Sequence, residues 1–449
     1  MNEFTGVTTI HPVGAGILGI LGLATLLAPR AYALLPTIVL VCFIPVSQRV
    51  VIAGADFHFL RIMTVFGWVR ILSRNEAAGF RFKPIDLWQI AVVGIGTAIY
   101  LALRTETSAL VYRLGYAFDA VGMYFMFRVL VRDGKDVDRV IRSFVILSIP
   151  VAGFFLIEYV THRNMFSVFG GVSPITHVRD GRLRCQGAFA HAILAGVFWG
   201  TTLPLMVGRL ALVPRERWLG VAGVLATLFI VFTTSSSTPV MSVLFTIFGC
   251  GMFVFRRRMR AIRWGSVVAL IALHLVMKGP VWSLIARVNV ISGSTGWHRY
   301  HLIDAAIKHF DDWWALGTLT TENWDAWGQL RDITNQYVFE GVNGGLWTLL
   351  AFVGLIAAAF AGVGRFVRAR RGDLRAEWFG WCVGVTLFVH AMNFIALTYF
   401  AQMIMHWLLT LAIVGAIAPA RRAVPAARPA RASRPAGLER GRPRVPAAS

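Results

Sequence analysis

Three short polar segments in an otherwise apolar chain carry the residue types that could perform chemistry. The first spans residues 177–196, and four of its side chains are candidates for contacts with a substrate: Arg182, Arg184, Gln186 and His191. A guanidinium presents a planar fork of donors that matches a phosphate or a diphosphate. Arg184 is therefore a candidate anion-binding group, and the alternative is a structural ion pair with Asp180 or with a carboxylate from another loop. His191 is either a site residue or a hydrogen-bonded histidine at the end of a helix.

The second segment reads W-H-R-Y-H at residues 297–301. Its apolar spacing predicts a helix over His298–Phe310, on which His298 and His301 are i, i+3 neighbours. Two histidines without an H-E-x-x-H pattern are a weak metal signal, and the four cysteines suggest neither a disulfide nor a zinc site. We therefore expect no metal or cofactor. Arg299 is the candidate for a second anion-binding group, with His298 beside it.

The third segment, residues 331–346, precedes an apolar run and contains four polar candidates: Asp332, Asn335, Tyr337 and Glu340. A carboxylate at this place could take a proton from an attacking hydroxyl, if burial and neighbours bring its pKa toward the working pH. The alternative is a helix cap for Asp332 and an ion pair for Glu340. The glycines at 341, 344 and 345 predict close helix packing or a bend.

The elements that must position these segments are apolar runs of about the length that crosses a bilayer. The chain is 57% hydrophobic and 15% charged, whereas soluble domains carry roughly 25% charge. Because backbone groups in lipid must bond internally, and no run shows sustained strand-like alternation, each run predicts a helix. The expected fold is an all-α polytopic membrane protein with twelve or thirteen spans, at about residues 13–29, 31–47, 57–72, 86–103, 108–131, 141–160, 190–208, 218–234, 238–255, 264–281, 345–364, 378–397 and 402–418.

The net charge of +22 could suggest a nucleic-acid partner, but the Arg and Lys clusters follow alternate spans, as the positive-inside rule describes. We attribute the positive charge to membrane topology and expect no nucleic-acid partner. This places residues 161–189 and 282–344 on the outer side and the C-terminus in the cytoplasm. The side of the N-terminus depends on whether 57–72 crosses the bilayer. Residues 1–418 would form one membrane domain, and 419–449 a disordered basic tail near anionic lipid.

Two charged residues fall inside one apolar run, and such residues are functional candidates by default. Arg113 and Asp119 are six positions apart and do not share a helix face. Each therefore needs a partner from another helix.

At the three polar segments the chain resembles the O-antigen ligase and polymerase superfamily of bacterial membrane glycosyltransferases. The first motif reads Arg184-Cys-Gln-Gly187-Ala-Phe189-Ala-His191, where relatives show Arg-x-x-Gly-x-Phe before a helix. The large loop has an arginine at the head of a helix, Arg299, and closes with Thr334-Asn335-Gln336-Tyr337 before a glycine-rich span. Relatives that attach glycan to lipid A often have His where this chain has Thr334. The pattern with Asp332 is similar to D-x-T-N-x-Y in exopolysaccharide polymerase-like members, which favours a polymerase over a ligase.

The resemblance implies a glycosyltransferase C-like fold in the bacterial inner membrane, with one large periplasmic loop that contains short helices. It implies an undecaprenyl-diphosphate-linked oligosaccharide as donor, a glycan as acceptor, neither a nucleotide sugar nor an essential metal, and a chain-length regulator as a partner. The catalytic residues would be Arg184, Arg299 and Asp332. The substrate-binding residues would be Arg182, Gln186, His191, His298, Asn335, Tyr337 and Glu340.

Two other classes of function stay open on the sequence. A lipid-linked glycan flippase or exporter would show internal symmetry and polar residues at the bilayer midplane, and neither is visible. A non-catalytic subunit of a polysaccharide assembly complex would keep the fold and tolerate substitution of every residue named above.

Overall fold

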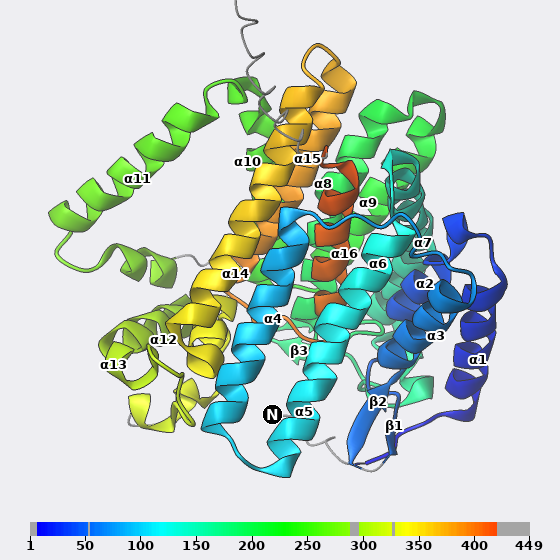
Figure 1. Cartoon of the computed structure of the whole chain (residues 1–449), viewed down its shortest axis with the longest axis horizontal. Helices are drawn as coiled ribbons and strands as arrows, with labels where there is room; N and C mark the ends of the chain where they lie inside the picture. The colour runs from blue at the N-terminus through cyan, green and yellow to red at the C-terminus, as the bar shows by residue number, and fades with distance from the viewer. Residues whose placement is uncertain (1–6, 53, 288–295, 326–327, 420–449) are drawn as a thin grey trace, which may run out of the picture. The chain divides into compact units, whose positions relative to one another are not determined.

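A computed structural model describes residues 7–52, 54–287, 296–325 and 328–419, and the statements below refer to these ranges. The structure is 74% helical (Figure 1), which confirms the all-α class. Seven of the described helices are long and apolar enough to cross a membrane, which supports a membrane protein. They are Pro84–Leu103, Gly134–Thr161, Ala192–Leu212, Pro214–Thr233, Ser237–Phe255, Met259–Val276 and Gln336–Ala369.

Two short hairpins lie between the helices, which the expectation of helices alone did not include. The first pairs β1 (Arg49–Ile52) with β2 (Ala55–His58), with Arg49 opposite His58. The second pairs β3 (His177–Arg179) with β4 (Arg182–Arg184), with His177 opposite Arg184. Both central residues of the second turn have positive φ, 50° at Asp180 and 71° at Gly181. An Asp-Gly pair suits this turn because its backbone twist matches that of the flanking strands.

The N-terminal part contains α1 (Pro12–Leu27), α2 (Leu35–Phe43), α3 (Phe59–Ser73) and α4 (Pro84–Leu103). The next predicted span is interrupted, because a π-helical turn at Phe118–Met123 separates α5 (Thr107–Ala117) from α6 (Tyr124–Leu130). Asp119 lies in that turn and accepts hydrogen bonds from Arg61 Nη2 at 2.6 Å and His58 Nε2 at 3.1 Å. Arg113 contacts the rings of Tyr100 and Tyr116, and its Nε donates to the Thr97 hydroxyl of α4 at 3.3 Å. Both residues have a partner from another helix, as expected.

The central part contains α7 (Gly134–Thr161), α8 (Ala192–Leu212), α9 (Arg217–Thr233) and α10 (Ser237–Gly251), followed later in the chain by α15 (Leu374–Asn393) and α16 (Gln402–Ile417). Helix α8 packs against all of the other five, and 83% of its apolar stretch is buried. Small residues allow the close approach. A Cβ at Gly196 would lie 2.5 Å from Pro239 of α10, and one at Gly208 would lie 2.8 Å from Cys382 of α15.

A chain of hydrogen bonds joins α8, α15 and α16 through two buried histidines. His406 Nε2 lies 2.8 Å from the Thr202 hydroxyl, and His406 Nδ1 lies 3.2 Å from His390 Nε2. His390 Nδ1 lies 2.9 Å from the Tyr399 hydroxyl. This chain of bonds ties the 394–401 connection to the core.

The large loop holds α12 (Gly296–Lys308) and α13 (Phe310–Trp313), which confirms the helix expected from His298 onward. It leads into α14 (Gln336–Ala369), whose backbone is not helical at Gly344 and Gly345. The break frees backbone groups for the loop, because Leu346 N–H donates to Trp314 O and Thr318 N–H donates to Val342 O. Gly345 has φ 63°, and a Cβ there would lie 2.5 Å from Ala315 O. The predicted bend is confirmed, and it serves as a docking point for the loop.

Helix α11 (Met259–Val276) differs from the other long apolar helices, because none of its residues is buried. It extends away from the rest of the chain in Figure 1. Its apolar side chains near the end are largely exposed, with Leu275 at 78% and Val276 at 83%. The span was expected at 264–281, five residues further along the chain. Most of the expected basic tail, residues 420–449, lies outside the described ranges.

We expect Asp86→Asn to destabilise the protein by about 3–5 kcal/mol, because breaking a buried ion pair leaves its partner uncompensated. The Asp86 carboxylate is fully buried and accepts from Arg128 Nε at 2.8 Å, from the Tyr124 hydroxyl and from the Lys83 backbone N–H. The measurement is the unfolding midpoint in detergent. Glu322→Gln, which breaks the exposed pair with Arg331, is the control and should change the midpoint little. Equal midpoints for the two variants would contradict the prediction.

Candidate functional site around the turn between α9 and α10

A buried carboxylate near the end of α7 holds the backbone of the segment that carries Arg184. Glu158 Oε1 accepts from the Gln186 N–H at 3.0 Å, and Oε2 accepts from the Gly187 N–H at 2.9 Å. Gly187 has φ 55°, and a Cβ there would lie 2.5 Å from the Phe155 ring. Only glycine fits this approach without strain. Glu158 therefore fixes the backbone directly after Arg184.

Three further contacts tie the same segment to other elements. The Cys185 N–H donates to Thr233 O at the end of α9 at 3.1 Å. Asn164 Nδ2 donates to Gly187 O at 2.8 Å, and Gln402 Nε2 of α16 donates to Ala188 O at 3.2 Å. The Arg184 segment is thus positioned by side chains and backbone that come from four parts of the chain.

Arg299 lies on α12 and reaches the same region from the other loop. Its Nη2 donates to the Thr238 hydroxyl at 2.9 Å, in the first turn of α10. Thr233 and Thr238 flank the polar connection between α9 and α10. The two arginine-bearing segments, more than 100 residues apart in the sequence, are therefore anchored on one turn, residues 233–238. We call this connection the hydroxyl turn, since all six of its residues are Thr or Ser.

Neither arginine has an acidic partner within 4.0 Å among the described residues. The Nε atoms of Arg184 and Arg299 are both buried and have no hydrogen-bond acceptor there. Partial burial lowers the pKa of both guanidinium groups, and the charge of Arg179 lowers that of Arg184 further. With an ordinary pKa above 12, both groups remain cations at neutral pH. Each is a cation with an unused buried donor that could bind an anion.

Arg184 and Asp332 both lie close enough to His191 to interact with it electrostatically. Partial burial lowers the pKa of His191, Arg184 lowers it further, and the Asp332 carboxylate opposes both effects. His191 is the residue before α8 and is exposed, as is Asp332. The structure therefore brings together three predicted site residues, Arg184, His191 and Asp332, from two different loops. An exposed carboxylate near a neutral imidazole can accept a proton from an incoming hydroxyl.

The remaining candidates at the start of α14 have structural partners. Asn335, not Asp332, caps the helix, because its Oδ1 accepts from the Val338 N–H at 3.1 Å. The Tyr337 hydroxyl donates to Ala391 O at 3.0 Å. Glu340 is buried and accepts from Gln336 Nε2 at 2.8 Å rather than forming an ion pair. Their substrate-binding roles stay predictions, and the contacts show that all three also hold α14 in place.

Three other candidates have, within the described ranges, no side-chain partner that defines a role. Arg182 is exposed on β4, His298 is half-buried on α12, and Gln186 is half-buried with its backbone engaged by Glu158. Their roles stay predictions as well. Within the part of the chain that the structure describes, no group of three or more His, Cys, Asp or Glu residues could hold a metal ion.

Two residues of this site were missed in the sequence. Glu158 lies near the end of an apolar run and was counted as part of a span. Thr238 is the last of six consecutive hydroxyl residues and the first residue of the expected span 238–255, so it was given no polar role. An unpaired acid at a membrane boundary and a hydroxyl-only connection are both signals that could have indicated polar contacts.

We expect Glu158→Gln to loosen the Arg184 segment, because an amide offers one acceptor oxygen where the carboxylate offers two. Losing one charge-assisted hydrogen bond costs about 1.5–3 kcal/mol. Amide hydrogen exchange in residues 185–190 should become at least about tenfold faster. Glu106→Gln, at the exposed start of α5, is the control and should leave that exchange unchanged. Unaltered exchange in the Glu158 variant would show that the carboxylate does not hold the segment.

The chain was compared with protein-family models and with curated proteins, and neither comparison finds a match.

Proposed function

We propose that this protein is a membrane glycosyltransferase that polymerises or transfers lipid-diphosphate-linked glycan on the outer side of the bacterial inner membrane. The observation that carries the proposal is that Arg184 and Arg299 each keep a buried Nε–H without an acceptor, on two segments that both contact the hydroxyl turn. A buried N–H that lacks an acceptor costs free energy, because it has lost its bond to water without a replacement. A diphosphate from undecaprenyl-diphosphate-linked oligosaccharide supplies the missing acceptors for both.

The reaction breaks the bond between the anomeric carbon and the diphosphate oxygen, while an acceptor hydroxyl attacks that carbon. Negative charge grows on the departing diphosphate, and Arg184 and Arg299 stabilise it. The proton of the attacking hydroxyl passes to a carboxylate. Exposure favours Asp332 over Glu340 for this role, because Glu340 is buried and already hydrogen-bonded to Gln336.

The chemistry at Thr334 favours a polymerase. Its hydroxyl is buried and has no partner among the described residues. A hydroxyl is far too weak a base to replace the histidine that ligases of the similar superfamily often have at this position. Asp332 would therefore act as the base. The donor lipid then lies among the membrane helices while its sugars reach the site from the outer side. Twelve or thirteen spans with residues 161–189 and 282–344 outside complete the proposed topology.

We expect Arg184→Ala and Arg299→Ala each to lower the rate of glycan transfer by about 10²–10³, by analogy with removal of an oxyanion donor. The assay is conversion of a defined undecaprenyl-diphosphate oligosaccharide to longer products by purified protein. Arg179→Ala is the matched control. It lies on the same hairpin but is exposed and adjacent to Asp180, so its rate should stay close to that of the unaltered protein.

Normal product in both arginine variants would reject the enzymatic proposal. Movement of labelled lipid-linked glycan across vesicles without elongation would instead indicate a flippase.

We expect Thr238→Val to lower the transfer rate by about tenfold, because Arg299 loses its hydrogen-bond partner and is less well oriented. Valine is close in volume to threonine, so packing of α10 changes little. Thr246→Val is the control on the same helix, since the Thr246 hydroxyl only bonds to Ser242 O in the preceding turn. A rate loss of equal size in both variants would show a packing effect rather than an effect on Arg299.

A further inference from the structure

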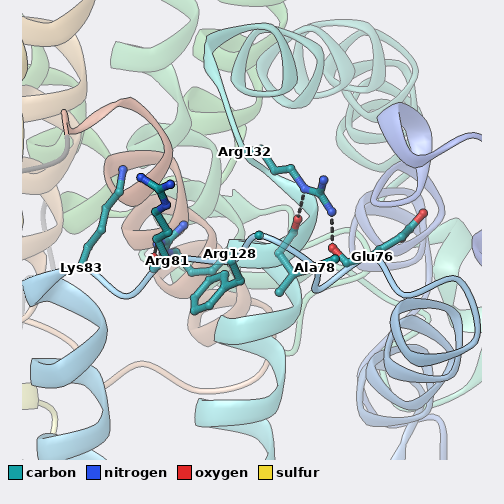
Figure 2. Close-up of a pocket in the computed structure, with 9 residues that line it drawn as sticks. Glu76, Ala78, Arg81, Lys83, Arg128 and Arg132 are labelled. Carbon is teal, nitrogen blue, oxygen red and sulfur yellow. Dashed lines mark hydrogen bonds between the residues drawn. The ribbon is translucent and has the colours of Figure 1, made fainter.

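A small basic cavity lies at the other end of the helices from the proposed site. Its volume is about 190 Å³, and it lies between the α3–α4 connection and the end of α6 (Figure 2). Helix α16 runs from the proposed site to the cavity. Gln402 at its start contacts Ala188, and Gly415 and Ala418 at its end contact Lys83. The cavity is lined by Glu76, Ala78, Gly79, Phe80, Arg81, Lys83, Arg128, Val129 and Arg132.

The lining has an excess of positive charge that the protein does not neutralise. Glu76 is the one acidic residue that lines it, and Arg70 already binds both of its oxygens, at 2.9 and 2.8 Å. Arg128 is paired with the buried Asp86. The other three cations, Arg81, Lys83 and Arg132, have no carboxylate within 4.0 Å in the described ranges.

Backbone carbonyls hold two of these cations in place. Lys83 Nζ donates to Ala418 O at 2.6 Å and to Gly415 O, at the end of α16 where the helix dipole is negative. Arg132 donates from Nε to Val129 O at 3.0 Å and from Nη2 to Glu76 O. Figure 2 shows Arg132 on one side of the cavity and Lys83 on the other. Burial and the nearby Arg128 lower the pKa of Lys83, so an anion in the cavity would be favoured.

A partly exposed aromatic cluster adjoins the charged lining. The rings of Phe80, Phe82 and Phe125 contact one another, with centroids 5.2–5.9 Å apart, and Phe82 is 63% exposed. A soluble anion gains nothing from an adjacent apolar surface. A lipid binds to both parts of the cavity, because its phosphate is stabilised by cations and its acyl chains pack on an apolar surface.

We propose that this cavity binds the phosphate group of an anionic membrane lipid, with Arg81, Lys83 and Arg132 as its ligands and the Phe80–Phe82–Phe125 cluster against its acyl chains. The proposed topology places the cavity at the cytoplasmic leaflet, where Arg and Lys side chains meet anionic headgroups. The inference does not depend on the proposed transferase activity.

The test compares lipid retention by the full-length protein, using native mass spectrometry after purification in detergent with phosphatidylglycerol or phosphatidylcholine. The double variant Arg81→Gln, Arg132→Gln should bind phosphatidylglycerol about 25-fold more weakly than the unaltered protein, from roughly 1 kcal/mol for each basic residue near a lipid surface. Binding of phosphatidylcholine should be weak in both. Unchanged unfolding midpoints would show that the variant is folded. The Lys83→Gln variant is an independent test and should also bind phosphatidylglycerol more weakly.

The matched control is Arg74→Gln, Arg371→Gln, which removes the same charge from two exposed positions outside the cavity. Loss of phosphatidylglycerol in the cavity variants but not in this control supports the proposal. Equal loss in the control would show diffuse attraction and overturn it. Inorganic phosphate that binds the unaltered protein as tightly as the lipid would overturn the lipid assignment in favour of a soluble anion.

Discussion

Taking a guanidinium out of water costs several kcal/mol unless other groups replace its hydration, and this constraint organises the charged residues of the chain. Arg70 is bound by Glu76, Arg128 by Asp86, and Arg209 by both Asp138 and Glu216 at 2.7 Å. Each of these arginines is nearly inaccessible and links separate elements. Among the described residues, four arginines depart from the pattern because each keeps a buried N–H without an acceptor: Arg104, Arg184, Arg299 and Arg365. Arg184 and Arg299 are the two whose segments both contact the hydroxyl turn. Their departure falls where two loops meet, and for that reason we assign it to a ligand.

The membrane helices contribute to this site by holding loop backbone rather than by offering side chains to a substrate. Glu158 of α7, Thr233 of α9 and Gln402 of α16 all bind main-chain atoms of the Arg184 segment. The histidine pair on α15 and α16 fixes Tyr399, whose N–H donates to Gln336 Oε1 at the start of α14. Short polar contacts thus join the helical core to both loops, so that the loop residues are positioned without long rigid elements of their own.

The features that the sequence predicted well were those set by local pattern. Apolar runs located the helices, the spacing after His298 located α12, and Gly344 and Gly345 located the bend in α14. The features that it missed depend on contacts between distant parts of the chain. Glu158 binds residues 28 and 29 positions away, and Thr238 meets Arg299 at a separation of 61. The β3–β4 hairpin was missed although Asp180-Gly181 is a strong turn signal, because three-residue strands are too short to show an alternating pattern.

The isolation of α11 has a consequence for how its sequence can vary. A helix that packs on neighbours is restricted in shape at every contact, whereas α11 has no buried residue to restrict. His274 is the exception near its end, since it stacks on Trp282 and accepts from the Val281 N–H. At the other positions no packed neighbour among the described residues selects the shape of a side chain, so leucine, valine and isoleucine can replace one another there. Evolutionary drift in this helix would then be bounded by hydropathy, by its length of eighteen residues and by His274.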